Sequence, residues 1–395
     1  MDAKCEFRMK VRRGTGVTAP PGPGRLARHV NIGASLLALL SAALFGAATP
    51  LSKLLLRDFN AFQLSGLLYL GAAIGMLPLA FRRGAAAGGA WRSDRRSVAR
   101  LAGAVFFGGC LGPVLLMLGL SAARSSSVSL WLNFELAATA LLGVFFFKDH
   151  LDVRGWLGAG AMLLAGVAVA VGEGTGGVLP AVLVGLACTC WAIDNHLTAL
   201  IGGLTPAQST LAKGLVAGTA NLAIGVLLQP RLPGAGSFAG ALALGAISYG
   251  GSIALYITSA QSLGATRSQV IFASAPFFGM ILSLPLLGER LSWPLAAAVP
   301  LIVAGIALMH RSVHAHGHRH GGLEHLHLHR HDDGHHGHEH PGTPAGQPDA
   351  RGHMHWHVHE AVQHDHPHVS DLHHRHDHGD RGREGACGGR AAGDR

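Results

Sequence analysis

Histidine is the residue type with the most evident chemistry in this chain, and it is concentrated in one part of it. Of the 27 histidines, 24 lie at or beyond His310, and many of them alternate with other residues in short runs. Neutral imidazole is a good ligand for divalent zinc, nickel, cobalt and copper, and histidine is largely neutral at neutral pH. The runs predict metal binding by the following residues: His314, His316, His318, His320, His325, His327, His329, His331, His353, His355, His357, His359, His364, His366 and His368.

The segment that carries these runs, residues 311–395, also contains many glycine, proline and aspartate residues. This composition is typical of a disordered tail and not of a packed domain. A flexible chain satisfies several coordination geometries, so the tail should discriminate poorly between Zn, Ni, Co and Cu. Its biological use is open between buffering metal near a pore, sensing metal to gate transport, and a neutral extension. No cofactor is expected to be required for activity.

Ionisable residues within apolar runs are the second group of candidates, because a charge at membrane depth is costly and usually faces a cavity or a partner. Glu135 lies in such a run, with Asn133 close by and Trp131 one turn earlier, on the same face of a continuous helix. We expect Glu135 to line a substrate pathway or bind a coupling ion. A structural hydrogen bond between helices is the alternative.

A polar triplet, Asp194-Asn195-His196, and Lys213 lie in two later apolar runs. Asp194 and Lys213 are at similar distances from the ends of their predicted helices, so the two side chains could form an ion pair. The pair would belong to the pathway or would only neutralise two buried charges; alternatively, Lys213 extends to the interface. His196, Cys188 and Cys190 are the main possible metal ligands in this part of the chain.

Aromatic residues complete the set of pathway candidates. Tyr249 and Tyr256 share a helical face with two serines, which suits a cavity wall as well as it suits ordinary packing. Trp191 lies one turn before Asn195. The predicted pathway residues are Glu135, Trp131, Asn133, Trp191, Asp194, Asn195, His196, Lys213, Tyr249 and Tyr256.

The elements that position these residues are ten apolar stretches. The chain is 49% hydrophobic and 13% charged, and a spanning helix needs about 20 mostly apolar residues. The stretches predict an all-α polytopic membrane protein with the bilayer as its solvent. Their approximate ranges are 32–51, 60–81, 99–120, 127–147, 154–172, 178–200, 206–228, 237–260, 268–287 and 293–310.

The net charge of +9 is a membrane feature and not the footprint of nucleic acid. Residues 1–310 hold 22 Lys and Arg against 10 Asp and Glu, whereas residues 311–395 hold 9 against 12. Basic residues cluster before the first stretch and between the second and third, which predicts that both segments are cytoplasmic. Ten spans then return the C-terminus to the cytoplasm, and the cytoplasmic membrane is the expected location.

The chain also repeats itself. Leu101-Ala-Gly-Ala and Phe238-Ala-Gly-Ala open the third and eighth stretches, and Val-Ala-Gly-like segments recur in the fifth and tenth. An odd number of spans per repeat inverts the second copy, as in many secondary transporters. We divide the chain into a disordered basic leader (1–30), a first five-helix repeat (31–173), a second five-helix repeat (174–310) and the tail (311–395).

Two further motifs resemble the EamA-type transporters of the drug/metabolite transporter superfamily. The fourth stretch contains Asn133-Phe134-Glu135-Leu136-Ala137, and the ninth contains Ala273-Ser274-Ala275-Pro276-Phe277 followed by Leu287-Gly288-Glu289-Arg290-Leu291. The resemblance covers residues 32–310. It implies ten helices, cytoplasmic termini and transport of a small molecule by alternating access, and it implies nothing about the tail.

These observations predict a secondary transporter of a small metabolite or drug-like solute, not an enzyme. One alternative is a divalent-metal (Ni, Co or Zn) transporter whose tail collects or senses metal in the cytoplasm; another is a membrane-anchored metal buffer. The expected partners are the lipid bilayer and a small-molecule or ion substrate, without nucleic acid. A homodimer is left open by the sequence.

Overall fold

The computed structural model describes most of the helical body and four short segments of the tail. The described residues are 32–81, 95–147, 151–201, 204–231, 233–263, 265–311, 315–319, 323–329, 353–359 and 363–367. The predicted leader (1–30) and most of the tail lie outside these ranges, as do the predicted metal ligands His314, His320, His331 and His368. The predictions made for those residues remain untested.

Within the described residues, ten helical stretches are long and apolar enough to cross a membrane, which confirms the predicted number. The first five contain α1 (Ile32–Leu55), α2 (Ala61–Ala80), α3 (Arg95–Ala104), the π-helix η2 (Val105–Leu111), α4 (Gly112–Ala122), α5 (Ser125–Trp131), α6 (Phe134–Phe147) and α7 (Val153–Gly172). The second five contain the 3₁₀ turn η3 (Thr175–Gly177), α8 (Val178–Ala199), α9 (Pro206–Leu228), α10 (Ala235–Leu244), the π-helix η4 (Gly245–Gly251), α11 (Ser252–Leu263), α12 (Ala265–Phe272), α13 (Ala275–Leu287) and α14 (Trp293–Arg311).

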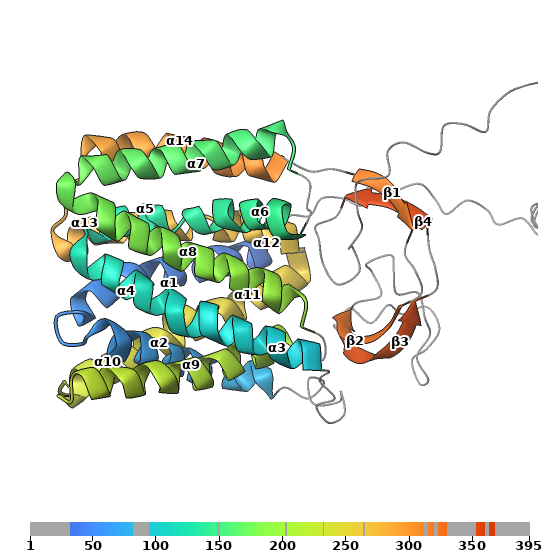
Figure 1. Ribbon diagram of the computed structural model, residues 1–395, viewed down its shortest axis with the longest axis horizontal. Helices are drawn as coiled ribbons and strands as arrows, with labels where there is room; N and C mark the ends of the chain where they lie inside the picture. The colour runs from blue at the N-terminus through green and yellow to red at the C-terminus, as the bar shows by residue number, and fades with distance from the viewer. Residues whose placement is uncertain are drawn as a thin grey trace, which may run out of the picture.

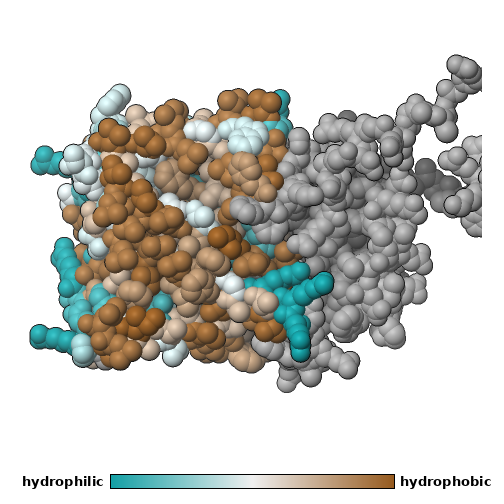
Figure 2. Space-filling view, in the orientation of Figure 1, coloured by the Kyte–Doolittle hydropathy of each residue, from teal (hydrophilic) through white to brown (hydrophobic). Residues whose placement is uncertain are grey.

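The outer surface of the helical body is apolar, as a bilayer requires. Figure 2 shows hydrophobic residues over most of the visible face, with hydrophilic residues gathered at the ends of the helices. Large apolar side chains such as Leu164, Val171 and Leu227 are exposed on this surface. In a membrane they contact lipid, and the helical backbone satisfies its own polar groups. The protein is therefore a multi-pass membrane protein.

The two repeats interlock through equivalent pairs of helices (Figure 1). The first helix of each repeat packs against the third and fourth spans of the other: α1 contacts α11 and α13, and α8 contacts α4 and α6. The second spans, α2 and α9, pack on each other, and so do the fifth spans, α7 and α14. These contacts between the repeats follow from their inverted arrangement. They place helices of both repeats side by side in the middle of the body.

Glycines allow the second spans of the two repeats to approach closely. A Cβ added at Gly214 or Gly218 of α9 would lie 2.7 or 2.8 Å from backbone atoms of α2 at Tyr69 and Leu70. A Cβ at Gly71 of α2 would collide with the carbonyl of Leu242 in α10. Small residues thus let these helices pack closely, with Gly71 on the eighth span and Gly214 and Gly218 on the second.

The fourth and ninth spans are each broken near their middle, at equivalent places. Turns at 132–133 separate α5 from α6, and turns at 273–274 separate α12 from α13. The expectation that Trp131 and Glu135 share one face of a continuous helix was wrong, because the break puts them in separate helices, with Trp131 fully buried at the end of α5 and Glu135 at the start of α6. The third and eighth spans each contain a seven-residue π-helix, η2 and η4. Both irregularities recur in the two repeats.

The described part of the tail forms two antiparallel strand pairs. Strand β1 (Ala315–Arg319) pairs with β4 (Gln363–Pro367), and β2 (Leu323–His329) pairs with β3 (His353–His359). The register sets His318 opposite His364 and His327 opposite His355. The tail was expected to lack a packed domain. Most of its residues lie outside the described ranges, so this expectation stays a prediction.

Candidate functional site

A cavity of about 170 Å³ lies where the two repeats meet, and both repeats contribute to its wall. We call it the central cavity. Its lining includes residues of α1, α4, α6, α8, η4, α12, α13 and α14, and the break after Phe272 faces it. The polar and aromatic lining residues are Phe45, Thr49, Asn133, Glu135, Thr139, Trp191, Asn195, Tyr249, Gln269, Phe272 and His310.

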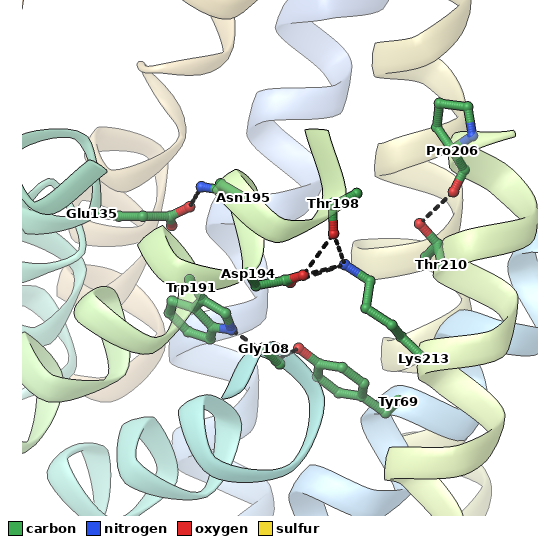
Figure 3. A network of polar contacts seen from close by, with 10 residues as sticks. All are labelled: Tyr69, Gly108, Glu135, Trp191, Asp194, Asn195, Thr198, Pro206, Thr210 and Lys213. Carbon is green, nitrogen blue, oxygen red and sulfur yellow. Dashed lines mark hydrogen bonds and ion pairs between the residues drawn. The ribbon is translucent and has the colours of Figure 1, made fainter. Parts of the chain in front are cut away.

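Glu135 enters the cavity wall from the first turn of α6, directly after the break in the fourth span. Its carboxylate accepts a hydrogen bond of 2.9 Å from the Nδ2 amide of Asn195 in α8 (Figure 3). Asn133 also lines the cavity, and its amide Nδ2 donates to the carbonyl of Leu130, 3.0 Å away. In a regular helix the backbone polar groups at this depth would all be paired within the helix. The break instead lets polar groups face the cavity.

Aromatic rings form much of the remaining wall. Phe45 packs edge-on against Tyr249, with ring centroids 5.5 Å apart, and lies 5.3 Å from Phe272. Trp191 is held in place because its Nε1 donates to the carbonyl of Gly108, 3.1 Å away. Tyr256 does not line the cavity; it packs on Phe272 and donates from its hydroxyl to Gln269 Oε1 at 2.7 Å. These contacts fix the orientation of rings that face the cavity.

Asp194 and Lys213 form the predicted ion pair, next to the cavity and not in its lining. The Nζ atom of Lys213 lies 2.9 Å from both carboxylate oxygens of Asp194, and Thr198 donates to the same carboxylate at 2.8 Å (Figure 3). Both charged side chains are largely buried. Because each charge has its partner within contact distance, the pair adds little net field to the cavity.

The carboxylate of Asp194 packs directly on Gly108 in the π-helix η2. A Cβ at Gly108 would collide with the Oδ2 atom of Asp194, so only glycine fits there. The Gly108 carbonyl accepts hydrogen bonds from the Tyr69 hydroxyl at 2.6 Å and from Trp191. The π-helix therefore provides both the space for the ion pair and the acceptor that anchors Trp191.

Two other predicted pathway residues lie away from the cavity. Trp131 is fully buried, and its Nε1 donates to the carbonyl of Gly166 at 3.1 Å, which ties α5 to α7. The ring Nε2 of His196 is 3.0 Å from the carbonyl of Thr139 in α6. Of the ten predicted pathway residues, the cavity brings together Glu135, Asn133, Trp191, Asn195 and Tyr249, with Asp194 and Lys213 adjacent.

Several lining residues were missed by sequence reasoning: Phe45, Thr49, Thr139, Gln269, Phe272 and His310. Phe45 and Phe272 belong to apolar runs in which any position can face lipid, so their type carries no signal. Gln269 is a polar residue near the start of a span and could have been noticed. His310 was placed at the end of the last predicted span, but it was not predicted to line a pathway.

The cavity lining can be placed relative to the two ends of the helical body. We call the end where α14 finishes, at Arg311, the tail end, and the opposite end, where α4 meets α5, the far end. The lining residues Asn195 and Gln269 are exposed toward the tail end, and His310 lies there too. Part of the cavity lining thus lies near the tail end.

At the far end, two charged residues hold the helices together. Glu289, after α13, accepts from the backbone N–H groups of Ser125 at 2.7 Å and Ser126 at 2.9 Å, at the start of α5. The Nζ atom of Lys53 in α1 donates to the carbonyls of Leu120 and Ala123 at 2.6 and 3.0 Å, at the end of α4. We call these contacts the far-end latch. The Glu289 contacts join the two repeats, and the Lys53 contacts join two helices of the first repeat.

Comparison with known proteins gives this architecture its family. The sequence pattern of the EamA-like transporter family matches residues 32–171 and 178–311, one match for each five-span repeat. The chain belongs to the EamA-like transporter family. As an EamA-like protein it is a membrane transporter of small solutes, and membership in a family of transporters supports the prediction that it is not an enzyme.

Two further comparisons add little. One solved structure, titled "Crystal structure of protein", is 18% identical to this EamA-like chain, with a TM-score of 0.49. The match covers 70% of this chain and 98% of the solved chain. Among curated proteins, no match was found.

Proposed function

We propose that this EamA-like protein is a secondary transporter that moves a small organic metabolite or drug-like solute by alternating access through the central cavity. One observation carries the proposal: residues of both inverted repeats, including both helix breaks, line the same cavity. In an inverted repeat, exchange of the two halves' conformations converts access from one end into access from the other.

We further propose that the tail end is cytoplasmic and that the far-end latch stabilises the inward-open conformer. The support is the distribution of basic residues, which favours a cytoplasmic location for both termini. Weakening the latch should then shift the population toward the outward-open conformer, because the latch contacts exist in one of the two conformers.

The metal-transport alternative finds no support in the helical body. Among its described residues, no group of three or more His, Cys, Asp or Glu side chains is arranged to hold a metal ion. Cys188 donates weakly to backbone carbonyls of the fourth span, and His196 lies against Thr139. We therefore propose an organic solute and not a metal ion as cargo.

Two-sided thiol labelling tests alternating access without knowledge of the substrate. The five natural cysteines are replaced by alanine, and Thr49→Cys in the cavity wall is treated with a membrane-impermeant reagent in sealed vesicles of either orientation. We expect labelling from the tail end in the parent protein, and additional labelling from the far end after Glu289→Gln. A solvent-exposed cysteine at Arg57→Cys, beyond the far end of α1, reports vesicle orientation.

Simultaneous labelling from both ends in the parent protein would indicate a channel and overturn the proposal. So would a latch variant that stays folded yet never admits the reagent from the far end. Transport itself is then measured as solute accumulation by intact cells that express the parent chain or Glu135→Gln, against a vector control.

A further inference from the structure

The lining of the central cavity carries one sign of charge. Among the described residues that face it, Glu135 is the single carboxylate, and lysine and arginine are not represented. Its hydrogen-bond donor, the Asn195 amide, is neutral. The neighbouring Asp194 and Lys213 compensate each other at 2.9 Å. An ionised Glu135 thus leaves the cavity with an uncompensated negative charge.

The aromatic part of the wall suits the same ligand class. Phe45 packs on both Tyr249 and Phe272, with ring centroids 5.5 and 5.3 Å away, and Trp191 is fixed by its bond to Gly108. The faces of aromatic rings attract cations, and the attraction grows when water is excluded. The rings also bury apolar groups of a ligand. Carboxylate and rings together favour a ligand that has both a positive charge and an apolar body.

Other ligand classes fit the lining poorly. An anion would face Glu135 in a poorly hydrated site and would meet no fixed positive charge there. A sugar-like solute needs many hydrogen-bond partners, yet the amide of Asn133 is used by Leu130 and the oxygen of Gln269 accepts from Tyr256. By contrast, the Nε2 atom of His310 is buried and makes no hydrogen bond among the described residues, so a neutral imidazole can accept one from an ammonium group.

We infer that the cavity binds small organic cations with an aromatic or apolar body, and that Glu135 is the charge-recognising residue. This inference rests on the proposed function, since the cavity that binds the cation is the one proposed to carry solute across the membrane. It names the substrate class of that cavity.

Three probes that share one aromatic body test the inference: phenethylammonium, phenethyl alcohol and hydrocinnamate. Binding to the full chain in lipid nanodiscs is followed by the quenching of tryptophan fluorescence and by calorimetry. We expect saturable binding of the ammonium probe and at least about tenfold weaker binding of the other two. Glu135→Gln should weaken ammonium binding by about tenfold or more, because a charge-assisted contact is lost while the acceptor for Asn195 is kept.

Two further variants separate recognition from folding. Trp191→Leu should weaken ammonium binding by roughly threefold to tenfold through loss of a cation–π contact. Asp58→Asn is the matched control, because this carboxylate bonds Ser237 near the far end and lies outside the cavity. It should leave binding unchanged.

Stronger binding of hydrocinnamate than of the ammonium probe would overturn the inference. Unchanged ammonium binding in folded Glu135→Gln, shown by the same elution volume and thermal midpoint as the parent, would overturn it as well. Either result leaves two-sided thiol labelling free to succeed, so failure of the cation inference is distinguishable from failure of alternating access.

Discussion

The two repeats place equivalent helices in contact, but the contacts hold different chemistry. Where the third span of the first repeat meets the first span of the second, Asp194 packs on Gly108 and pairs with Lys213. At the equivalent contact, between the eighth span and α1, Ser41 and Ser252 exchange hydrogen bonds of 2.7 and 2.9 Å with each other's carbonyls. One contact is charged and borders the cavity near Trp191; the other is neutral.

The fourth and ninth spans differ in the same way. Both are broken, and the aligned motifs lie at the breaks. The first repeat has Glu135 there, whereas the second has Ala275, which is buried beside Gly46. The inverted fold thus determines where the chain must bend and where helices meet. The residues at those places are free to diverge: Glu135 is in the first repeat, and the Asp194–Lys213 pair is in the second.

The largest expected effect comes from removing one partner of the charged contact. Asp194→Ala should destabilise the protein by about 3–5 kcal/mol, because Lys213 is left buried without a counter-ion. The thermal midpoint in nanodiscs measures this. The double variant Asp194→Leu with Lys213→Met removes both charges and should recover much of the loss. If the double variant is as unstable as the single one, the unpaired charge of Lys213 is not the cause of the destabilisation.

The far-end latch should come next. Glu289→Ala removes the acceptor for two backbone N–H groups of α5, a loss of about 1.5–3 kcal/mol for a charge-assisted contact. The expected result is greater access of thiol reagents from the far end, with little change in total fold. The exposed Asp58→Asn variant serves as the comparison. Unchanged access would show that the latch does not hold the far end closed.

The two π-helices allow a sharper comparison of equivalent positions. Gly108 is the fourth residue of η2, and Ser248 is the fourth residue of η4. Gly108→Ala should cost about 1–3 kcal/mol, because the new methyl group collides with the Asp194 carboxylate. Ser248→Ala should cost less, about 1 kcal/mol. Chemical or thermal unfolding of the two variants measures the difference, and equal costs would contradict the asymmetry.

The neutral contact should give the smallest effect. Ser252→Ala removes hydrogen bonds to Ser41, and such bonds between membrane helices contribute about 0.6 kcal/mol on average. A small shift of the thermal midpoint is expected. A loss as large as that of Asp194→Ala would mean that the serine contact is as critical as the charged one, and the proposed difference between the repeats would fail.

Some features of the site could be read from single residues and their spacing. Asp194 and Lys213 were predicted to pair because their depths match, and the structure places them 2.9 Å apart. Glu135 was predicted to be functional because a charge within an apolar run is costly and usually faces a cavity or a partner. The role of Trp131 could not be read in this way: the break at 132–133 separates it from Glu135 and lets it bond Gly166 instead.

The sequence alone determined the ten spans, the duplication and the inverted arrangement of the two repeats, because membrane burial demands long apolar runs and an odd number of spans inverts the copy. It also determined which ionisable residues lie at membrane depth. Only the tertiary structure decided that Phe45, Gln269 and Phe272 join Glu135 at one cavity, and that Glu289 bonds the start of α5 at the far end. The physical reason is that in an apolar run every face can be buried or can contact lipid. Which face turns inward depends on helix breaks, π-helices and contacts between residues distant in the chain.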